Sequence, residues 1–345
     1  MATTDSAGTE EQLSSKGKGP VAGRSPSVLG GRLEAVALPL TWVVVAAVFS
    51  FLRPDTFFTW ANVSSILASQ AVLLLVALAL IIPLTANDFD LSVAAVVGLS
   101  AMIIAILNAS WGWPVGLAIV CAVAVGALIG FVNGALTVFL GIESLIVTLG
   151  MSTFVSGIML WISGTRTITG VSSGLIDFVI RRRLLGIPYG FYYGLVLVTL
   201  LWYVFRYTPL GQRLLVVGRG REVARLSGIR VGRMRLGAMV ASATIGSIGG
   251  VLIVGTSGSA GPTTGIDLLL PAFAAAFLGA TTIEPGRFNP WGTAIAVYFL
   301  VTGITGLQLL GGETFVQNLF YGAALIGAVA FSQVVKKRRA TVQGP

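Results

Sequence analysis

Charged side chains are scarce in this sequence, since Asp, Glu, Lys and Arg make up only 10% of its 345 residues. Soluble domains contain about 25% charged residues, so a surface that faces water on all sides is excluded. There is no histidine, and Cys121 is the only cysteine. An intrachain disulfide is therefore impossible, and zinc sites and histidine proton relays lose their usual ligands. We expect no metal and no other cofactor.

The first 30 residues contain no apolar run and are rich in Gly, Ser, Thr and Pro. A cleavable signal peptide needs an apolar stretch of about 7–15 residues, so we expect none here. Polar segments of this kind bury too little apolar surface to fold. We therefore expect residues 1–33 to form a disordered cytoplasmic tail.

Long apolar runs, by contrast, are abundant, and 55% of the residues are hydrophobic. A membrane-spanning helix needs about 20 mostly apolar residues. We therefore predict an all-α polytopic bundle of about ten transmembrane spans within residues 34–335. The weaker segment 56–69 is predicted as a short interfacial helix. We place the spans near residues 35–52, 68–86, 91–107, 114–138, 143–163, 187–206, 235–255, 268–282, 290–311 and 314–335.

The Lys and Arg residues indicate the orientation, because they concentrate on the cytoplasmic side of membrane proteins. Ten spans put both termini on one side. With a cytoplasmic N-terminus, 17 of the 22 Lys and Arg residues lie inside. We therefore predict cytoplasmic termini, a cytoplasmic loop at 206–235 and a basic cytoplasmic tail at 336–345. The net charge of +9 then reflects topology and contact with membrane lipid, and no nucleic acid is expected as a partner.

Glycines recur at helical spacing in two of the predicted spans. Gly126, Gly130 and Gly134 lie four residues apart, as do Gly246 and Gly250. Small residues at this spacing let helix backbones approach closely. The pattern predicts a tightly packed bundle.

The loop at 206–235 is long for a connection between packed spans, which often indicates function. Residues 221–227 are predicted to form a short helix with a Glu222–Arg225 pair, and Gly228 is placed to end it in a left-handed conformation. Leu226 and Ile229 would be exposed as an apolar knob with a basic rim, which suits docking to a partner protein. A basic loop also suits anionic lipid headgroups. The candidate docking residues are Arg221, Glu222, Ala224, Arg225, Leu226, Ser227, Gly228 and Ile229.

Polar residues interrupt the apolar pattern at two places. After Pro83, which cannot continue a helical hydrogen-bond ladder, carboxylates and hydroxyls suit either a broken helix beside a pore or a turn that caps the next helix. The hydroxyls and glycines of 255–267 suit either an outer gate for a polyhydroxylated solute or a plain periplasmic loop. The candidate path residues here are Asn87, Asp88, Asp90, Ser92, Pro262, Thr263 and Asp267.

Three consecutive arginines, Arg181, Arg182 and Arg183, fall on the predicted outer face, against the general charge bias. One hypothesis is that they pair with carboxylates on a soluble solute-binding protein, where such charges set encounter rate and register. The alternative is contact with lipid phosphates.

Four motifs follow one another along the chain, each weak by itself. They are Asp90-Leu-Ser-Val; Gly130-Phe-Val-Asn-Gly with Val147-Thr-Leu-Gly; Arg225-Leu-Ser-Gly-Ile; and Pro262-Thr followed by Phe273-Ala-Ala-Ala-Phe-Leu-Gly-Ala-Thr. In this order and spacing, over about residues 55–335, the chain resembles the ribose/xylose/galactose-type permease subunits of bacterial ABC importers. From these motifs we add Asn133 and Thr148 to the candidate path residues.

The resemblance implies a multi-pass protein of the bacterial inner membrane that conducts a monosaccharide or related polyol. It also implies three kinds of partner: a cytoplasmic ABC ATPase, a periplasmic solute-binding protein and a second permease subunit. Residues 222–228 would correspond to the coupling helix that inserts into the ATPase. The permease itself would do no bond chemistry and would not be an enzyme. The chain departs from the family at Asp88, where members usually carry glycine, and at 269–271, where they usually carry Glu-Leu-Asp.

Other functions remain open from the residues alone. A permease of the same superfamily for branched-chain amino acids or nucleosides is one alternative. An ion-coupled carrier is another, although it would need coupling carboxylates or histidine deep in the bundle. No nucleophile–base pair or metal-ligand cluster favours an intramembrane enzyme. The sequence contains no GxxxxGK[ST] loop, so ATP hydrolysis would come from another chain.

Overall fold

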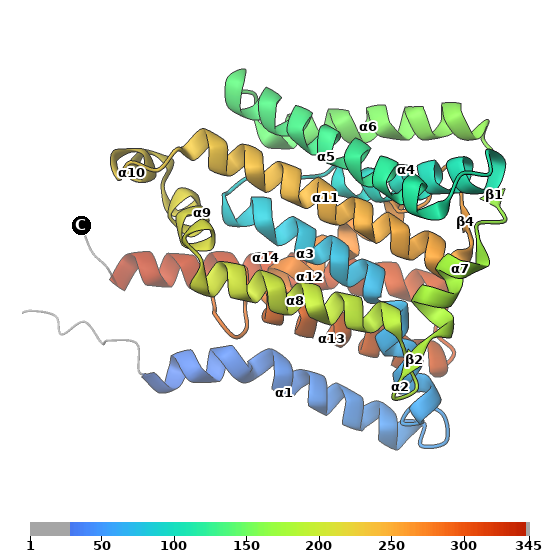
Figure 1. Cartoon of the computed structure of the whole chain (residues 1–345). Helices are drawn as coiled ribbons and strands as arrows, with labels where there is room; N and C mark the ends of the chain where they lie inside the picture. Colours follow the sequence, from blue (N-terminus) through green and yellow to red (C-terminus); the bar gives the residue numbers. More distant parts are fainter. Residues whose placement is uncertain (1–27, 343–345) are drawn as a thin grey trace, which may run out of the picture.

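The computed structural model describes residues 28–342, and over this range the chain folds as an all-α bundle (Figure 1). The first half contains α1 (Val28–Leu52), α2 (Trp60–Ser69), α3 (Ala71–Thr85), α4 (Val93–Ala105), the π-helix η1 (Ile106–Ser110), α5 (Val115–Phe139) and α6 (Ser144–Ser163). Next come β1 (Ile168–Thr169), α7 (Ser173–Ile176), the π-helix η2 (Asp177–Arg181), β2 (Arg183–Leu184), β3 (Ile187–Pro188) and α8 (Tyr189–Tyr207). The rest comprises α9 (Pro209–Arg219), α10 (Arg221–Leu226), α11 (Val231–Ser257), β4 (Ser259–Ala260), the 3-10 helix η3 (Ile266–Leu268), α12 (Leu269–Gly279), α13 (Pro290–Leu309) and α14 (Thr314–Val342).

The predicted all-α membrane bundle is confirmed, while the number of spans is confirmed only in part. Seven helices in the described range are long and apolar enough to cross a membrane. An eighth is formed if α8 and α9, which meet at a bend of 73°, count as one span. Two shorter apolar helices, Ile266–Gly279 and Phe315–Ala330, fall on the remaining predicted segments.

Several boundaries differ from the prediction. The segment 56–69 was expected to lie in the membrane interface, but α2 continues into α3 as one apolar helix, Trp60–Thr85. α1 begins at Val28, inside the predicted tail 1–33, whose first 27 residues lie outside the described range. α14 continues to Val342, through most of the predicted tail 336–345. Helical hydrogen bonding thus extends beyond the apolar runs from which the spans were predicted.

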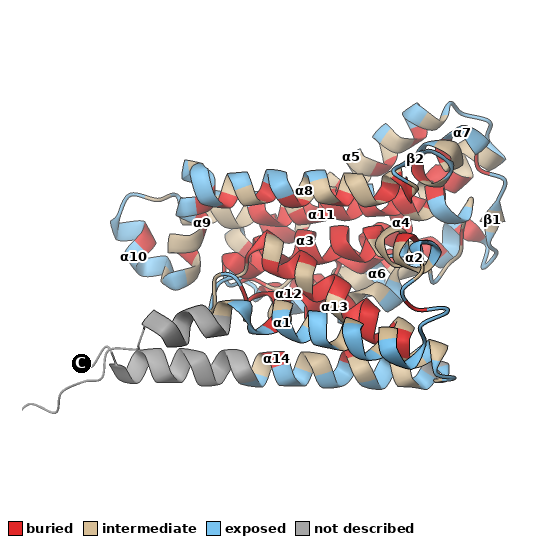
Figure 2. Ribbon diagram, turned by 90° about the horizontal axis from the view of Figure 1, so that it is seen from below, coloured by how far each residue is buried: buried red, intermediate tan, exposed pale blue. Residues whose placement is uncertain are grey.

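The core of the bundle forms around α3, which is buried along all of its 15 residues. A helix that is apolar on every side is expected to lie in the interior. It packs against α4, α8, α11, α12 and α13. Figure 2 shows buried residues along these central helices, whereas residues 35–52 of α1 and 315–330 of α14 are mostly exposed or intermediate and lie at the edge.

The glycine-rich faces of α5 and α11 pack directly on neighbouring helices, as their spacing predicted. A Cβ at Gly130 of α5 would lie 2.6 Å from the carbonyl oxygen of Met239 in α11. A Cβ at Gly250 of α11 would lie 2.5 Å from the carbonyl oxygen of Val97 in α4. Because no side chain fits at either position, glycine sets the spacing of these three helices.

The two ends of the bundle differ in character. At one end, called here the α10 end, lie α9 and α10, together with the start of α1 and the end of α14 (Figure 1). At the other, called the β end, β1 pairs with β4 and β2 pairs with β3, in both cases antiparallel. Residues that the sequence analysis grouped together are distributed between these two ends.

Candidate functional site

A break between two buried helices lies at the α10 end. α3 ends at Thr85, two residues after Pro83, and α4 begins at Val93. Asn87 turns the chain with φ = 59°, a left-handed conformation that asparagine tolerates better than most residues. The backbone N–H of Asp88 donates to the carbonyl of Pro83 at 3.0 Å. The connection, called here the 86–92 segment, is therefore held in a fixed turn rather than a loose loop.

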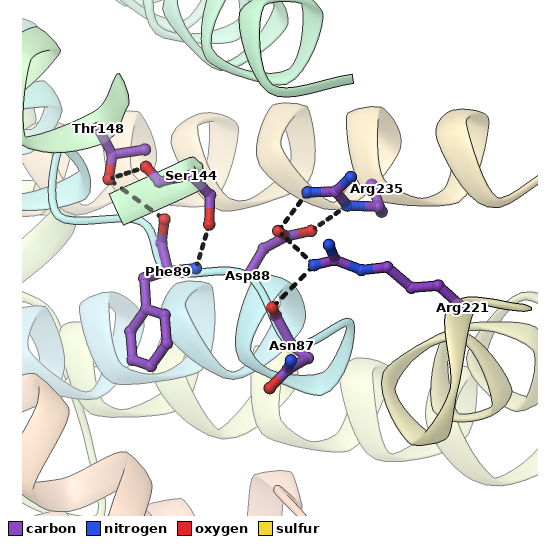
Figure 3. A network of polar contacts seen from close by, with 7 residues as sticks. All are labelled: Asn87, Asp88, Phe89, Ser144, Thr148, Arg221 and Arg235. Carbon is purple, nitrogen blue, oxygen red and sulfur yellow. Dashed lines mark hydrogen bonds and ion pairs between the residues drawn. The ribbon is translucent and has the colours of Figure 1, made fainter. Parts of the chain in front are cut away.

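Asp88 forms ion pairs with two arginines from elsewhere in the chain (Figure 3). Arg235 of α11 binds the carboxylate with two hydrogen bonds, Nε to Oδ2 at 2.7 Å and Nη2 to Oδ1 at 2.6 Å. Arg221, the first residue of α10, donates from Nη2 to Oδ1 at 3.0 Å and to the carbonyl oxygen of Asn87 at 3.1 Å. Asp88 is only 2% exposed, so its charge requires such partners.

The next residues use side chains of α6 for their backbone hydrogen bonds, as Figure 3 shows for Phe89. The N–H of Phe89 donates to Ser144 Oγ at 3.0 Å, and the N–H of Leu91 donates to Thr148 Oγ1 at 3.0 Å. Thr148 Oγ1 also donates, to the carbonyl oxygens of Ser144 or Phe89. Buried backbone outside a helix needs partners of this kind.

Asp90 lies deeper and has only neutral partners. Its Oδ1 accepts from the backbone N–H and hydroxyl of Ser92 at 3.0 and 2.7 Å, and its Oδ2 accepts from the hydroxyl of Ser242 in α11 at 2.7 Å. Asn133 of α5 donates from Nδ2 to Ser92 Oγ at 2.8 Å. Asp90 therefore caps the start of α4 as expected, but the Ser92 side chain makes no capping bond and binds Asp90 instead.

α10 matches its predicted geometry closely. Glu222 pairs with Arg225 at 2.6 Å, and Gly228 has φ = 78°, the left-handed conformation expected after a helix end. Leu226 is 81% exposed and Val223 is also exposed. Ala224 is fully buried and Ile229 is partly buried against the core, so neither lies on the outer surface of α10. The exposed apolar pair is thus Val223 and Leu226, where the sequence analysis had named Leu226 and Ile229.

A cleft of about 460 Å³ opens beside the Asp88 ion pairs. The end of α5, the connection from α5 to α6 and the first residue of α6 line it, together with Asn87, Asp88, Phe89, Arg221 of α10 and Arg235 of α11. Two buried side-chain oxygens nearby, Asn133 Oδ1 and Thr137 Oγ1, have no hydrogen-bond partner among the described residues.

The remaining candidates lie at the β end and do not join this site. Pro262, Thr263 and Asp267 belong to the connection between β4 and α12, at the opposite end from Asn87 and Asp88 (Figure 1). One candidate path therefore does not bring together all the residues proposed for it. The three arginines are exposed there too, but two have local contacts: Arg181 pairs with Asp177 at 2.7 Å, and Arg182 lies 5.3 Å from the centre of the Phe178 ring.

Sequence reasoning missed four residues of the site at the α10 end: Ser144, Val223, Arg235 and Ser242. Arg235 was counted only as a charge that fixes topology. Arg235 and Ser242 are seven residues apart, so they lie two turns apart on one face of α11, toward the 86–92 segment. That spacing was a usable signal, but the sequence does not show which distant segment this face contacts.

Residues 62–329 match the family described as "Branched-chain amino acid transport system / permease component". The chain belongs to this family. The permease is 30% identical over 314 residues to the galactose/methyl galactoside import permease protein MglC of Escherichia coli (strain K12), which covers 86% of this chain and 93% of MglC. The resemblance drawn from the four motifs is thereby confirmed.

Two further relatives have similar coverage. The D-allose transport system permease protein AlsC of Escherichia coli (strain K12) is 28% identical over 85% of this permease and 90% of its own length. The fructose import permease protein FrcC of Rhizobium meliloti is 29% identical over 87% and 86%, respectively. Family and apolar helices together identify a multi-pass membrane protein, and the family consists of transport permease components rather than enzymes.

Proposed function

We propose that this chain is the permease subunit of a bacterial ABC importer and forms the translocation path for a monosaccharide or related polyol. A cytoplasmic ABC ATPase supplies the energy, and a periplasmic binding protein delivers the solute. A second permease subunit completes the path. The protein spans the bacterial inner membrane ten times, with both termini and α10 in the cytoplasm.

The single observation that carries this proposal is the surface of α10. α10 is a six-residue helix at one end of the bundle, and the described residues leave its Val223 and Leu226 side chains exposed. Exposed apolar groups with a charged rim are typical of protein–protein contacts. Glu222, Arg225 and Ser227 form that rim, and the described chain holds the helix only from its Arg221 side.

The ten-span topology has support from the arrangement of the helices. Seven long apolar helices and the bent pair make up to eight crossings. The count reaches ten if each of the two shorter apolar helices also crosses. The start of α1 and the end of α14 both lie at the α10 end, as an even number of crossings requires (Figure 1). The arginine-rich α9 and α10 then face the cytoplasm, in agreement with the charge bias of membrane proteins.

The solute class comes from the relatives, whose names specify D-allose, fructose and galactose or methyl galactoside. The family description names branched-chain amino acids, so a permease for such a solute is the second candidate. An ion-coupled carrier has less support, because Asp88 is already paired with two arginines and Asp90 with hydroxyls.

The path and docking residues belong to the same proposal. We place Asn87, Asp88, Asp90, Ser92, Asn133 and Thr148 along the inner part of the route, and Pro262, Thr263 and Asp267 at its outer mouth. Arg181, Arg182 and Arg183 are exposed at the β end, where a periplasmic protein would approach. Reversing these three charges is expected to weaken uptake that depends on the binding protein and to leave assembly intact.

Co-purification with the ATPase tests the proposal. The ATPase should purify with the wild-type permease, and Leu226→Glu should reduce its recovery by on the order of tenfold, because a charge would enter an apolar contact. Leu185→Glu is the matched control, because Leu185 is 79% exposed at the β end. Equal recovery of ATPase with both variants, or solute transport by the permease alone under an ion gradient, would count against the proposal.

A further inference from the structure

We propose that Asp88 is a positioning residue that links the ATPase-docking helix α10 to the break between α3 and α4. Movement of α10 would then shift the 86–92 segment and, through it, the helices that this segment contacts. The inference rests on the proposed function, because it requires an ATPase that moves α10. Four features of the described residues support it.

The first feature is the way in which α10 is attached to the bundle. In the described chain, the side-chain hydrogen bonds from α10 to the rest of the bundle come from Arg221 and go to Asp88 and the carbonyl of Asn87. The preceding helix, α9, reaches the same place: Gly218 packs so closely on the Thr85 carbonyl that no Cβ would fit. Both helices of the cytoplasmic loop therefore bear on the end of α3 and the turn after it.

The second feature is that the two arginines bind the Asp88 carboxylate unequally. Arg235 holds both carboxylate oxygens and is only 14% exposed, so it keeps the buried charge paired at all times. Arg221 contacts Oδ1 alone and is 45% exposed. Its bond can break without leaving an unpaired buried carboxylate, which would be the costly event. The Arg221–Asp88 contact is thus the one able to open and close.

The third feature is that the contacts of the 86–92 segment with α5, α6 and α11 lie close to Asp88 in sequence. Within four residues the 86–92 segment bonds to α6 through Ser144 and Thr148, to α11 through Ser242, and to α5 through Asn133. A displacement of Asp88 therefore acts on three helices at once. Packed elements of this kind tend to switch between discrete arrangements rather than deform continuously.

The fourth feature is the cleft beside the Asp88 ion pairs. Asn87, Asp88, Arg221 and Arg235 line the cleft of about 460 Å³, together with the end of α5 and the start of α6. It gives the Arg221 side chain and the turn at Asn87 room to move without a clash. A purely structural ion pair would not require such space.

The experiment uses the complete importer in proteoliposomes and measures solute transported per ATP hydrolysed. Arg221→Gln removes the link but leaves the Asp88–Arg235 pair intact, and Asp88→Asn removes the link without altering α10. Glu284→Gln is the control, because it breaks another ion pair between elements, Arg206–Glu284 at 3.6 Å. Thermal unfolding and ATPase recovery are measured for every variant.

We expect Asp88→Asn to retain the ATPase and its hydrolysis while transport per ATP falls by on the order of tenfold, and Arg221→Gln to lower transport per ATP equally in the importers that keep their ATPase. The double variant should be no worse than Asp88→Asn alone, because Asp88→Asn already removes the link to Arg221. Unchanged transport per ATP in Arg221→Gln, or loss of ATPase from both variants, would overturn the inference. Failure of the wild type to couple ATP hydrolysis to uptake would instead reject the proposed function.

Discussion

Two threonines near the 86–92 segment differ only in whether their hydroxyls have partners. Thr148 Oγ1 accepts from the N–H of Leu91 and donates to a carbonyl oxygen, whereas Thr137 Oγ1 has no partner among the described residues. A buried polar group without a hydrogen bond costs about 1–3 kcal/mol. The two positions therefore respond in opposite directions to the same substitution.

Replacing each threonine by valine keeps its shape and removes its hydroxyl. Thr137→Val is expected to stabilise the permease by about 1 kcal/mol, since an unpaired group is lost. Thr148→Val is expected to destabilise it by about 1–3 kcal/mol, since the N–H of Leu91 loses its acceptor. Thermal unfolding of the purified permease measures both. A lower midpoint for Thr137→Val would show that its hydroxyl does have a partner.

At the residue scale, the sequence predicts local contacts and not distant ones. The Glu222–Arg225 pair and the left-handed Gly228 follow from spacing along one short helix, and both are confirmed. The partners of Asp88 lie more than 130 residues further along the chain. No periodicity connects residues so far apart. Asp88 was therefore predicted to be functional without its two arginines.

At the element scale, the packing of α5 on α11 depends on glycines, because their backbones approach too closely for a Cβ. Gly130→Ala is expected to lower stability by about 1–3 kcal/mol, since the new methyl group would press on α11. Gly157→Ala in α6 is the control, because nothing lies within 4 Å of its Cβ position. Thermal unfolding reports the difference.

Gly157→Ala, the control, is expected to leave the stability of the permease unchanged or to raise it by up to about 1 kcal/mol, because alanine favours a helix more than glycine does. If both variants unfold at the same temperature, the close approach of α5 and α11 is not what holds these helices together.

The helices themselves were the most predictable elements. Every apolar segment placed from the sequence coincides with a helix or a helix pair, because a chain in lipid must satisfy its backbone internally. Helix ends were less predictable. α11 begins at Val231, four residues before the predicted start at 235, and this extension contains Arg233. Hydropathy predicts the apolar part of a helix, and the helix itself extends beyond that part.

At the scale of the whole molecule, polar function separates into two ends joined by an apolar bundle. The α10 end holds the Asp88 ion pairs, the cleft and the exposed docking helix, and the β end holds the three arginines and the 255–267 connection. This division agrees with an importer that binds an ATPase on one side and a solute-binding protein on the other. The sequence had assigned the 206–235 loop and the three arginines to opposite faces, and the fold places them at opposite ends of the bundle.

The central claim is that α10 faces the cytoplasm and binds an ATPase, and labelling of single cysteines tests it most directly. In a Cys121→Ser background, Leu226→Cys and Leu185→Cys place one thiol at each end of the bundle. A membrane-impermeant maleimide should label position 185 in spheroplasts and position 226 only in inverted vesicles. Adding the ATPase should protect position 226. Labelling of position 226 from the periplasmic side, or no protection by the ATPase, would contradict the account.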